Sequence, residues 1–170
     1  MNKSGSAEKV NRGILLAVIM LSSFFNPFMG SAVNIALPSI GNELSMNAVS
    51  LSWIAMAFLL SSATMLVPFG KLADIIGRRK MLLWGNLFFV VATFLCSLSF
   101  SGTMLVISRF LQGMGSAMMV GSSMAIVISA FPPEIRGRII GLNTMAVYVG
   151  LSAAPWLGGI LTEHLGWRSI

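Results

Sequence analysis

The chain has 170 residues, 56% of them hydrophobic and only 9% charged, and its formal net charge is +6. Soluble domains carry about 25% charged residues, so this composition excludes a soluble globular fold and indicates a membrane protein. One cysteine and one histidine are too few for an intrachain disulfide, a metal centre or a hydrolase triad. We therefore expect no metal, no cofactor and no enzymatic activity.

Five apolar segments follow a polar, basic N-terminal segment, residues 1–12. Each segment is near the roughly 20 residues that a bilayer requires. Because backbone polar groups inside a membrane must find partners within their own segment, each is predicted to be an α-helix. The sequence thus predicts an all-α bundle of five transmembrane helices within residues 13–170, at about 13–37, 49–69, 81–100, 104–131 and 139–161.

Basic residues gather on one side of this predicted bundle. They lie in residues 1–12, in the connection at 70–80 and at Arg136 and Arg138, whereas the opposite side has only Arg168. The positive-inside rule then predicts a multi-pass protein of the cell (inner) membrane with a cytoplasmic N-terminus. Since these cations flank apolar runs, they indicate topology and contact with anionic lipid, and not a nucleic-acid site.

The connection between the second and third predicted helices is the most charged stretch of the chain. It is predicted to be a tight turn at the membrane surface, where glycine allows sharp backbone bends. Asp74 precedes Arg78 by four residues, either as a surface ion pair worth ~0–1 kcal/mol or as a latch on a moving bundle. Glu134 is a further candidate partner for these cations. The stretch contains Gly70, Lys71, Asp74, Gly77, Arg78, Arg79 and Lys80.

Polar residues inside the predicted helices are candidate functional groups, because they are costly in a bilayer. Arg109 either snorkels to the outer headgroups or is a fixed positive charge facing an internal cavity. Gln112 follows three residues later and shares that helix face. Asn34 is either a packing hydrogen bond or a substrate contact. Tyr148 is either an aromatic wall or a hydrogen-bonding group of the same cavity.

The end of the chain predicts a continuation. Trp167 and Arg168 are typical of an interfacial anchor before another helix. An odd number of helices and this abrupt end predict a fragment truncated before a sixth helix, with a naturally short protein as the alternative.

Four stretches resemble motifs of the major facilitator superfamily, in the right order. Residues 70–80 resemble its loop motif Gly-x-x-x-Asp-[Arg/Lys]-x-Gly-[Arg/Lys]-[Arg/Lys], with Ile75 in place of the first cation. Residues 109–115 resemble the fourth-helix motif Arg-x-x-Gln-Gly-x-Gly. Residues 150–159 resemble the fifth-helix antiporter motif, with Ala154 in place of a glycine. Residues 34–38 resemble the first-helix ending Asn-Val-Ala-Leu-Pro.

The closing residues 162–168 are typical of the drug:proton antiporter branch with fourteen helices. The resemblance implies most of the N-terminal six-helix half of such a transporter, which works by alternating access and exports small drug-like or amphipathic compounds in exchange for protons. The implied cytoplasmic gate comprises Gly70, Asp74, Gly77, Arg78 and Arg79. The implied proton-coupling and cavity residues are Arg109, Gln112 and Gly113. The implied antiporter contact comprises Gly150, Pro155, Gly158 and Gly159.

Two positions depart from the branch, which usually has an acid where this chain has Met29 and a tyrosine where it has Phe58. The resemblance therefore does not predict a proton site on the first helix. Proton-coupled efflux is the expected function. An uptake or facilitated carrier of the same fold remains an alternative, as does a half-bundle that does not transport and acts as a partner subunit or fragment.

Overall fold

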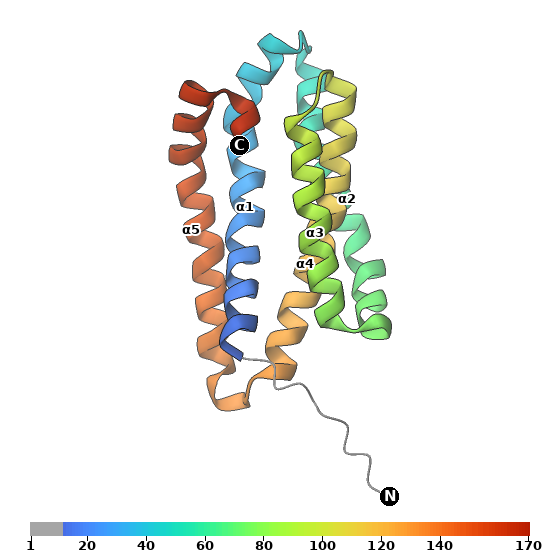
Figure 1. Cartoon of the computed structure of the whole chain (residues 1–170), viewed down its shortest axis with the longest axis vertical. Helices are drawn as coiled ribbons and strands as arrows, with labels where there is room; N and C mark the ends of the chain where they lie inside the picture. Colours follow the sequence, from blue (N-terminus) through green and yellow to red (C-terminus); the bar gives the residue numbers. More distant parts are fainter. Residues whose placement is uncertain (1–11) are drawn as a thin grey trace, which may run out of the picture.

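The structure is a computed structural model that describes residues 12–170, and over this range it contains long α-helices joined by short connections (Figure 1). Each of the five long helices is long and apolar enough to cross a membrane. The all-α bundle predicted from hydropathy is therefore confirmed for the described range. The elements are α1 (Arg12–Glu43), α2 (Ala48–Ile76), α3 (Arg78–Ser97), α4 (Gly102–Ala130), α5 (Pro133–Leu165) and the 3-10 turn η1 (Trp167–Ser169). The predicted N-terminal segment lies almost entirely outside this range.

Several helices extend beyond their predicted ends. α1 continues through Pro38 to Glu43, α2 continues to Ile76, and α5 begins at Pro133. Hydropathy marks only the part of a helix that lies in hydrocarbon, whereas the backbone hydrogen bonds of a helix continue equally well through polar residues. Proline removes one of these bonds without ending α1.

The predicted turn over residues 70–80 is in fact a single residue. Gly77 separates α2 from α3 and has φ of +100°, and the residues on either side of it are helical. Glycine adopts a positive φ without the Cβ clash that other residues suffer. The charged residues of this stretch therefore lie on the last turns of α2 and the first turn of α3, and not in a loop.

The connections define two ends of the bundle. The Gly77 end contains the junctions of α2 with α3 and of α4 with α5, and the Trp167 end contains the other junctions and η1 (Figure 1). α4 is the central helix. Half of the residues in its most apolar 18-residue stretch are buried, against 22–28% in the corresponding stretches of the other four helices. It packs on both α2 and α3, while α1 packs mainly on α5.

Small residues and hydroxyls hold these helices together. A Cβ at Gly115 would lie 2.8 Å from the backbone nitrogen of Phe89, so glycine lets α4 approach α3 closely. Such close contacts replace the hydrophobic driving force that is missing between helices in lipid. Hydrogen bonds add to them: α1 is tied to α3, α5 and α4 by Ser22–Asn86, Ser23–Asn143 and Asn26–Ser116, at 2.6–2.7 Å.

Candidate functional site

Arg109 is enclosed by three helices in the interior of the bundle. Its side chain is 1% exposed. Nε donates a hydrogen bond to the carbonyl of Ile54 on α2 at 3.4 Å. The guanidinium carbon lies 4.7 Å from the ring centroid of Phe58, also on α2, in a cation–π contact. The guanidinium thus points inward, and the alternative that it snorkels to the headgroups is not the arrangement found.

Gln112 joins Arg109 to α3. An Nη atom of Arg109 donates to Oε1 of Gln112, whose own side chain is only 2% exposed. Gln112 Nε2 donates to the hydroxyl of Thr93 at 2.7 Å, and that hydroxyl donates to the carbonyl of Phe89 at 2.8 Å. Every polar group of this buried row has a partner, which is what burial requires. Sequence analysis missed Thr93, because no motif surrounds it and its hydroxyl bond to an i−4 carbonyl is common in helices.

Gly113 explains why α2 reaches the guanidinium. A Cβ at this position would overlap the carbonyl oxygen of Phe58. With glycine there, the α2 backbone lies directly against α4, and both Phe58 and the Ile54 carbonyl come into reach of Arg109. The structure therefore brings together the three predicted residues of the fourth helix. It also shows the place of Phe58, which departs from the motifs that the chain resembles and supplies an aromatic face to Arg109.

A groove of about 650 Å³ runs between α1 and α3, with α4 at its base. Its lining is mostly apolar and includes Met29, while Arg109 and Gln112 lie at its wall. Among the described residues that line it, none is acidic. The described lining of the groove therefore offers Arg109 no carboxylate that could neutralise its charge.

The other two predicted cavity residues lie elsewhere. Asn34 is exposed on α1, and Tyr148 on α5 is 64% exposed. Neither lines the groove between α1 and α3. A cavity that includes them requires a surface outside the described residues, so their role stays a prediction.

The residues of the antiporter motif divide between two faces of α5. Gly150 and Gly158 face α1: a Cβ at Gly150 would overlap the carbonyl of Phe24, and one at Gly158 would lie 3.0 Å from Ala32 Cβ. Pro155 is exposed, and a Cβ at Gly159 would have no heavy atom within 4 Å. One half of the motif therefore packs α5 onto α1, and the other half is available on the open face of α5.

At the Gly77 end, Arg78 links three helices. Its Nε pairs with Asp74 Oδ1 at 3.0 Å, and its Nη1 donates to the carbonyl of Ala125 on α4 at 3.1 Å. The two ion pairs among the described residues are Asp74–Arg78 and Glu43–Arg168. The suggested pairing of Glu134 with these cations is therefore absent from the described range. Arg79 is exposed, and a Cβ at Gly70 would meet no heavy atom within 4 Å.

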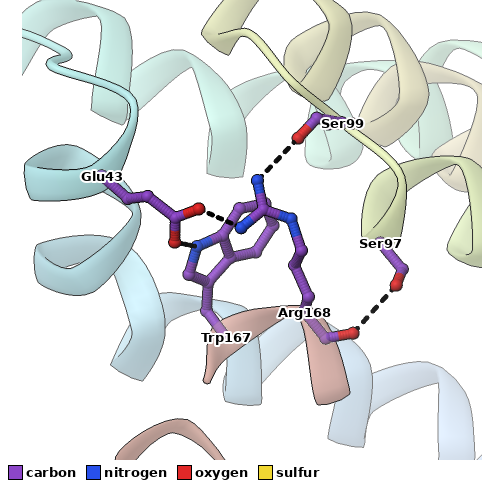
Figure 2. Close-up of polar contacts among 5 residues, drawn as sticks. All are labelled: Glu43, Ser97, Ser99, Trp167 and Arg168. Atoms are coloured by element: carbon purple, nitrogen blue, oxygen red, sulfur yellow. Dashed lines mark hydrogen bonds and ion pairs between the residues drawn. The ribbon is translucent and has the colours of Figure 1, made fainter. Parts of the chain in front are cut away.

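The Trp167 end carries a polar network that sequence analysis did not predict (Figure 2). Glu43, the last residue of α1, accepts hydrogen bonds from Trp167 Nε1 at 2.6 Å and from the Arg168 guanidinium. Arg168 also donates to the carbonyl of Ser99 at 3.0 Å, and the Ser97 hydroxyl donates to the Arg168 carbonyl at 3.0 Å. Trp167 is 6% exposed, so it is packed inside the protein and does not face lipid as an interfacial anchor would.

Comparison with known proteins identifies the family of this chain. The family model described as Major Facilitator Superfamily matches residues 19–170. The chain belongs to this superfamily of transporters, and it is not an enzyme.

The curated relatives are bacterial transport and resistance proteins. The riboflavin transporter RibZ of Clostridioides difficile (strain 630) is 34% identical over 92% of this chain and 34% of its own length. The methylenomycin A resistance protein of Bacillus subtilis (strain 168) is 31% identical over 100% of the chain and 37% of its own length. The multidrug resistance protein Stp of Mycobacterium tuberculosis (strain CDC 1551 / Oshkosh) is 32% identical over 100% of the chain and 30% of its own length.

A solved structure has the same fold. A bacterial homologue of the human lysosomal transporter Spinster, in an inward-facing and occupied conformation, superposes with a TM-score of 0.81 at 24% identity, over 89% of this chain and 33% of that one. The chain thus spans about a third of the length of the relatives it matches.

Proposed function

We propose that the chain supplies one helical bundle of a secondary active transporter that exports small amphipathic compounds in exchange for protons. The observation that carries the proposal is Arg109, a cation that is 1% exposed within a membrane-spanning helix and lies at the wall of an apolar groove. Buried charges inside membranes are retained for ion or substrate pathways. Two relatives whose names refer to multidrug and methylenomycin A resistance support efflux.

The proposal assigns roles to the predicted site residues. Arg109, Gln112 and Gly113 take part in proton coupling, and Asn34 and Tyr148 contact substrate. Residues 70–79 form the gate on the cytoplasmic side, with the N-terminus on the same side. The open face of α5, with Pro155 and Gly159, meets helices that lie outside the described residues. Those helices belong to a longer chain or a partner subunit, and two bundles rock about a central site in alternating access.

A second candidate is uptake by the same fold. The relative named as a riboflavin transporter favours it, and so does the absence of acidic side chains among the described residues that line the groove. An apolar groove that is lined by two arginines, Arg109 and Arg168, and by no acidic side chain of the described range suits a neutral or anionic compound better than a cationic drug.

Everted membrane vesicles that carry a pH-sensitive dye test the proposal. The vesicles contain the 170-residue chain or the full reading frame that includes it, and the compounds are cationic, neutral and anionic amphipathic dyes and riboflavin. We expect a compound-dependent collapse of the pH gradient, lost in Arg109→Gln and kept in the matched variant Arg138→Gln, since Arg138 is exposed. Gradient collapse that survives Arg109→Gln contradicts the assigned role of Arg109. Compound movement without any change in the gradient favours the carrier, and no response from either form favours a half-bundle that does not transport.

A further inference from the structure

The row of hydrogen bonds from Arg109 to Phe89 has a direction that its two ends impose. A guanidinium can only donate, and a backbone carbonyl can only accept. The Gln112 amide and the Thr93 hydroxyl lie between them, and each of these can do both. Every bond of the row must therefore point from Arg109 towards Phe89.

We infer that Thr93, on α3, is a positioning residue for Arg109: it holds the Gln112 amide with its oxygen towards the guanidinium. The Thr93 hydroxyl donates its only proton to the Phe89 carbonyl, so it accepts from the Gln112 nitrogen at 2.7 Å. In the reversed orientation the amide NH₂ would face the guanidinium, donor against donor, and its oxygen would have to compete with Phe89 for the Thr93 proton. The inference rests on the proposed role of Arg109 in coupling.

Burial makes this orientation consequential. Arg109 and Gln112 are 1% and 2% exposed, so water cannot replace a lost partner. The other hydrogen-bond and cation–π partners found for the guanidinium in the described range, the Ile54 carbonyl at 3.4 Å and the Phe58 ring at 4.7 Å, both belong to α2. Thr93, through Gln112, therefore ties the charge to a second helix, α3. Without its hydroxyl, Gln112 can rotate, and the guanidinium becomes free to turn into the groove that Arg109 and Thr93 both line.

Arginine labelling measures this directly. Phenylglyoxal reacts with accessible guanidinium groups, and its attachment to each arginine of the protein in lipid nanodiscs is read by peptide mass spectrometry. Thr93→Val keeps the β-branched shape without the hydroxyl, and Thr93→Ser keeps the hydroxyl. Thr64→Val is the matched control, because the Thr64 hydroxyl bonds only to carbonyls of its own helix, at 2.8 and 3.3 Å.

We expect Arg109 to be labelled several-fold faster in Thr93→Val, and at the wild-type rate in Thr93→Ser and Thr64→Val. Thr93→Ala replaces Thr93→Val if the latter loses cooperative thermal unfolding. Equal labelling of Arg109 in Thr93→Val and Thr64→Val overturns the inference. Loss of protection in Thr93→Ser as well would show a packing role for the methyl group and would overturn it too.

Transport separates this inference from the proposed function. In the everted vesicles, Thr93→Val should release fewer protons per compound moved than wild type, and Thr93→Ser should restore the ratio. Exposure of Arg109 in Thr93→Val with an unchanged ratio supports the positioning role and contradicts the proposed role of Arg109 in coupling. An unchanged ratio without exposure overturns the positioning role.

Discussion

Arg109 and its neighbours show how single residues determine the distance between helices. A guanidinium placed among apolar helices needs partners within a few ångströms, because no water reaches it. The Ile54 carbonyl, the Phe58 ring and Gln112 supply those partners. Two of the three come from α2, so they are in reach only if α2 lies directly against α4. Gly113 allows that contact, which makes a small residue as necessary to the site as the charged one.

Replacing Gly113 with alanine tests this dependence. The new Cβ would overlap the Phe58 carbonyl oxygen, so α2 and α4 must move apart. We expect a loss of about 1–3 kcal/mol of stability, typical of overpacking, seen as a lower midpoint of thermal unfolding in detergent. Gly121→Ala on the same helix is the control, since its Cβ would lie 3.7 Å from its nearest neighbour. It should be neutral or stabilising by up to about 1 kcal/mol. Equal midpoints for the two variants would contradict the close approach of α2.

Residues of the site differ in how far sequence can predict them. Arg109, Gln112 and Gly113 lie within five positions of one helix, so their common face follows from helical geometry. Thr93 lies on another helix, and whether it meets Gln112 depends on the tertiary packing of α3 on α4. A local sequence pattern does not predict which side chains of two packed helices meet. Phe58 is an intermediate case, because the sequence marks it as a departure and only the structure shows its contact with Arg109.

At the scale of elements, the short turn η1 connects helices that are distant in sequence. It follows α5, yet its Trp167 and Arg168 side chains bind Glu43 at the end of α1, and Arg168 also reaches the end of α3 (Figure 2). The guanidinium carbon of Arg168 lies 4.3 Å from the Trp167 ring centroid, so the two donors are held together. Glu43 is the acceptor that the two side chains share, so we expect it to help fix the position of η1.

Glu43→Ala should release η1 from α1. The backbone amides of Ser169 and Ile170 bond within the turn, to Gly166 and Trp167, and hydrogen exchange of these amides reports its order. We expect several-fold faster exchange at 166–170 in Glu43→Ala, measured by mass spectrometry. Glu163→Ala is the matched control, because Glu163 is an exposed acid near the same end with no bond among those found in the described range. Unchanged exchange in Glu43→Ala would show that the packing of Trp167 and the bonds of Arg168 with Ser97 and Ser99 hold the turn without Glu43.

The helices themselves were predictable because length and apolarity are local properties. Their ends were not, since α1 passes Leu37 and reaches Glu43 through polar residues that hydropathy assigns to a loop. The charged stretch at 70–80 illustrates the same limit. The stretch was predicted to be a turn between two helices, but its charged residues lie on the helices themselves, and the positive φ of Gly77 shows that one residue makes the turn. Backbone conformation at a junction depends on how the two helices pack, and a sequence pattern does not contain that.

At the scale of the molecule, charge is distributed unevenly between the two ends. Lys71, Arg78, Arg79 and Lys80 lie at the Gly77 end, together with the basic residues of α5, Arg136 and Arg138. Arg168 at the Trp167 end is paired with Glu43. Arg78 at the Gly77 end is likewise paired, with Asp74. One cation is thus neutralised at each end, and the remaining basic residues of these stretches lie at the Gly77 end. The positive-inside rule then predicts that the Gly77 end faces the cytoplasm.

Single cysteines at neutral positions test this orientation without changing any charge. In a Cys96→Ser background, Ile75→Cys and Gly137→Cys report the Gly77 end, and Phe100→Cys reports the Trp167 end. Ile75 and Phe100 are 80% and 81% exposed, and a Cβ at Gly137 meets no heavy atom within 4 Å. A membrane-impermeant maleimide should label Phe100→Cys in intact cells and the other two only in everted vesicles. Labelling of Ile75→Cys in intact cells would reverse the orientation, and it would place the proposed gate on the outer side. Labelling of all three from both sides would show mixed insertion, in which case the uneven charge does not determine the topology.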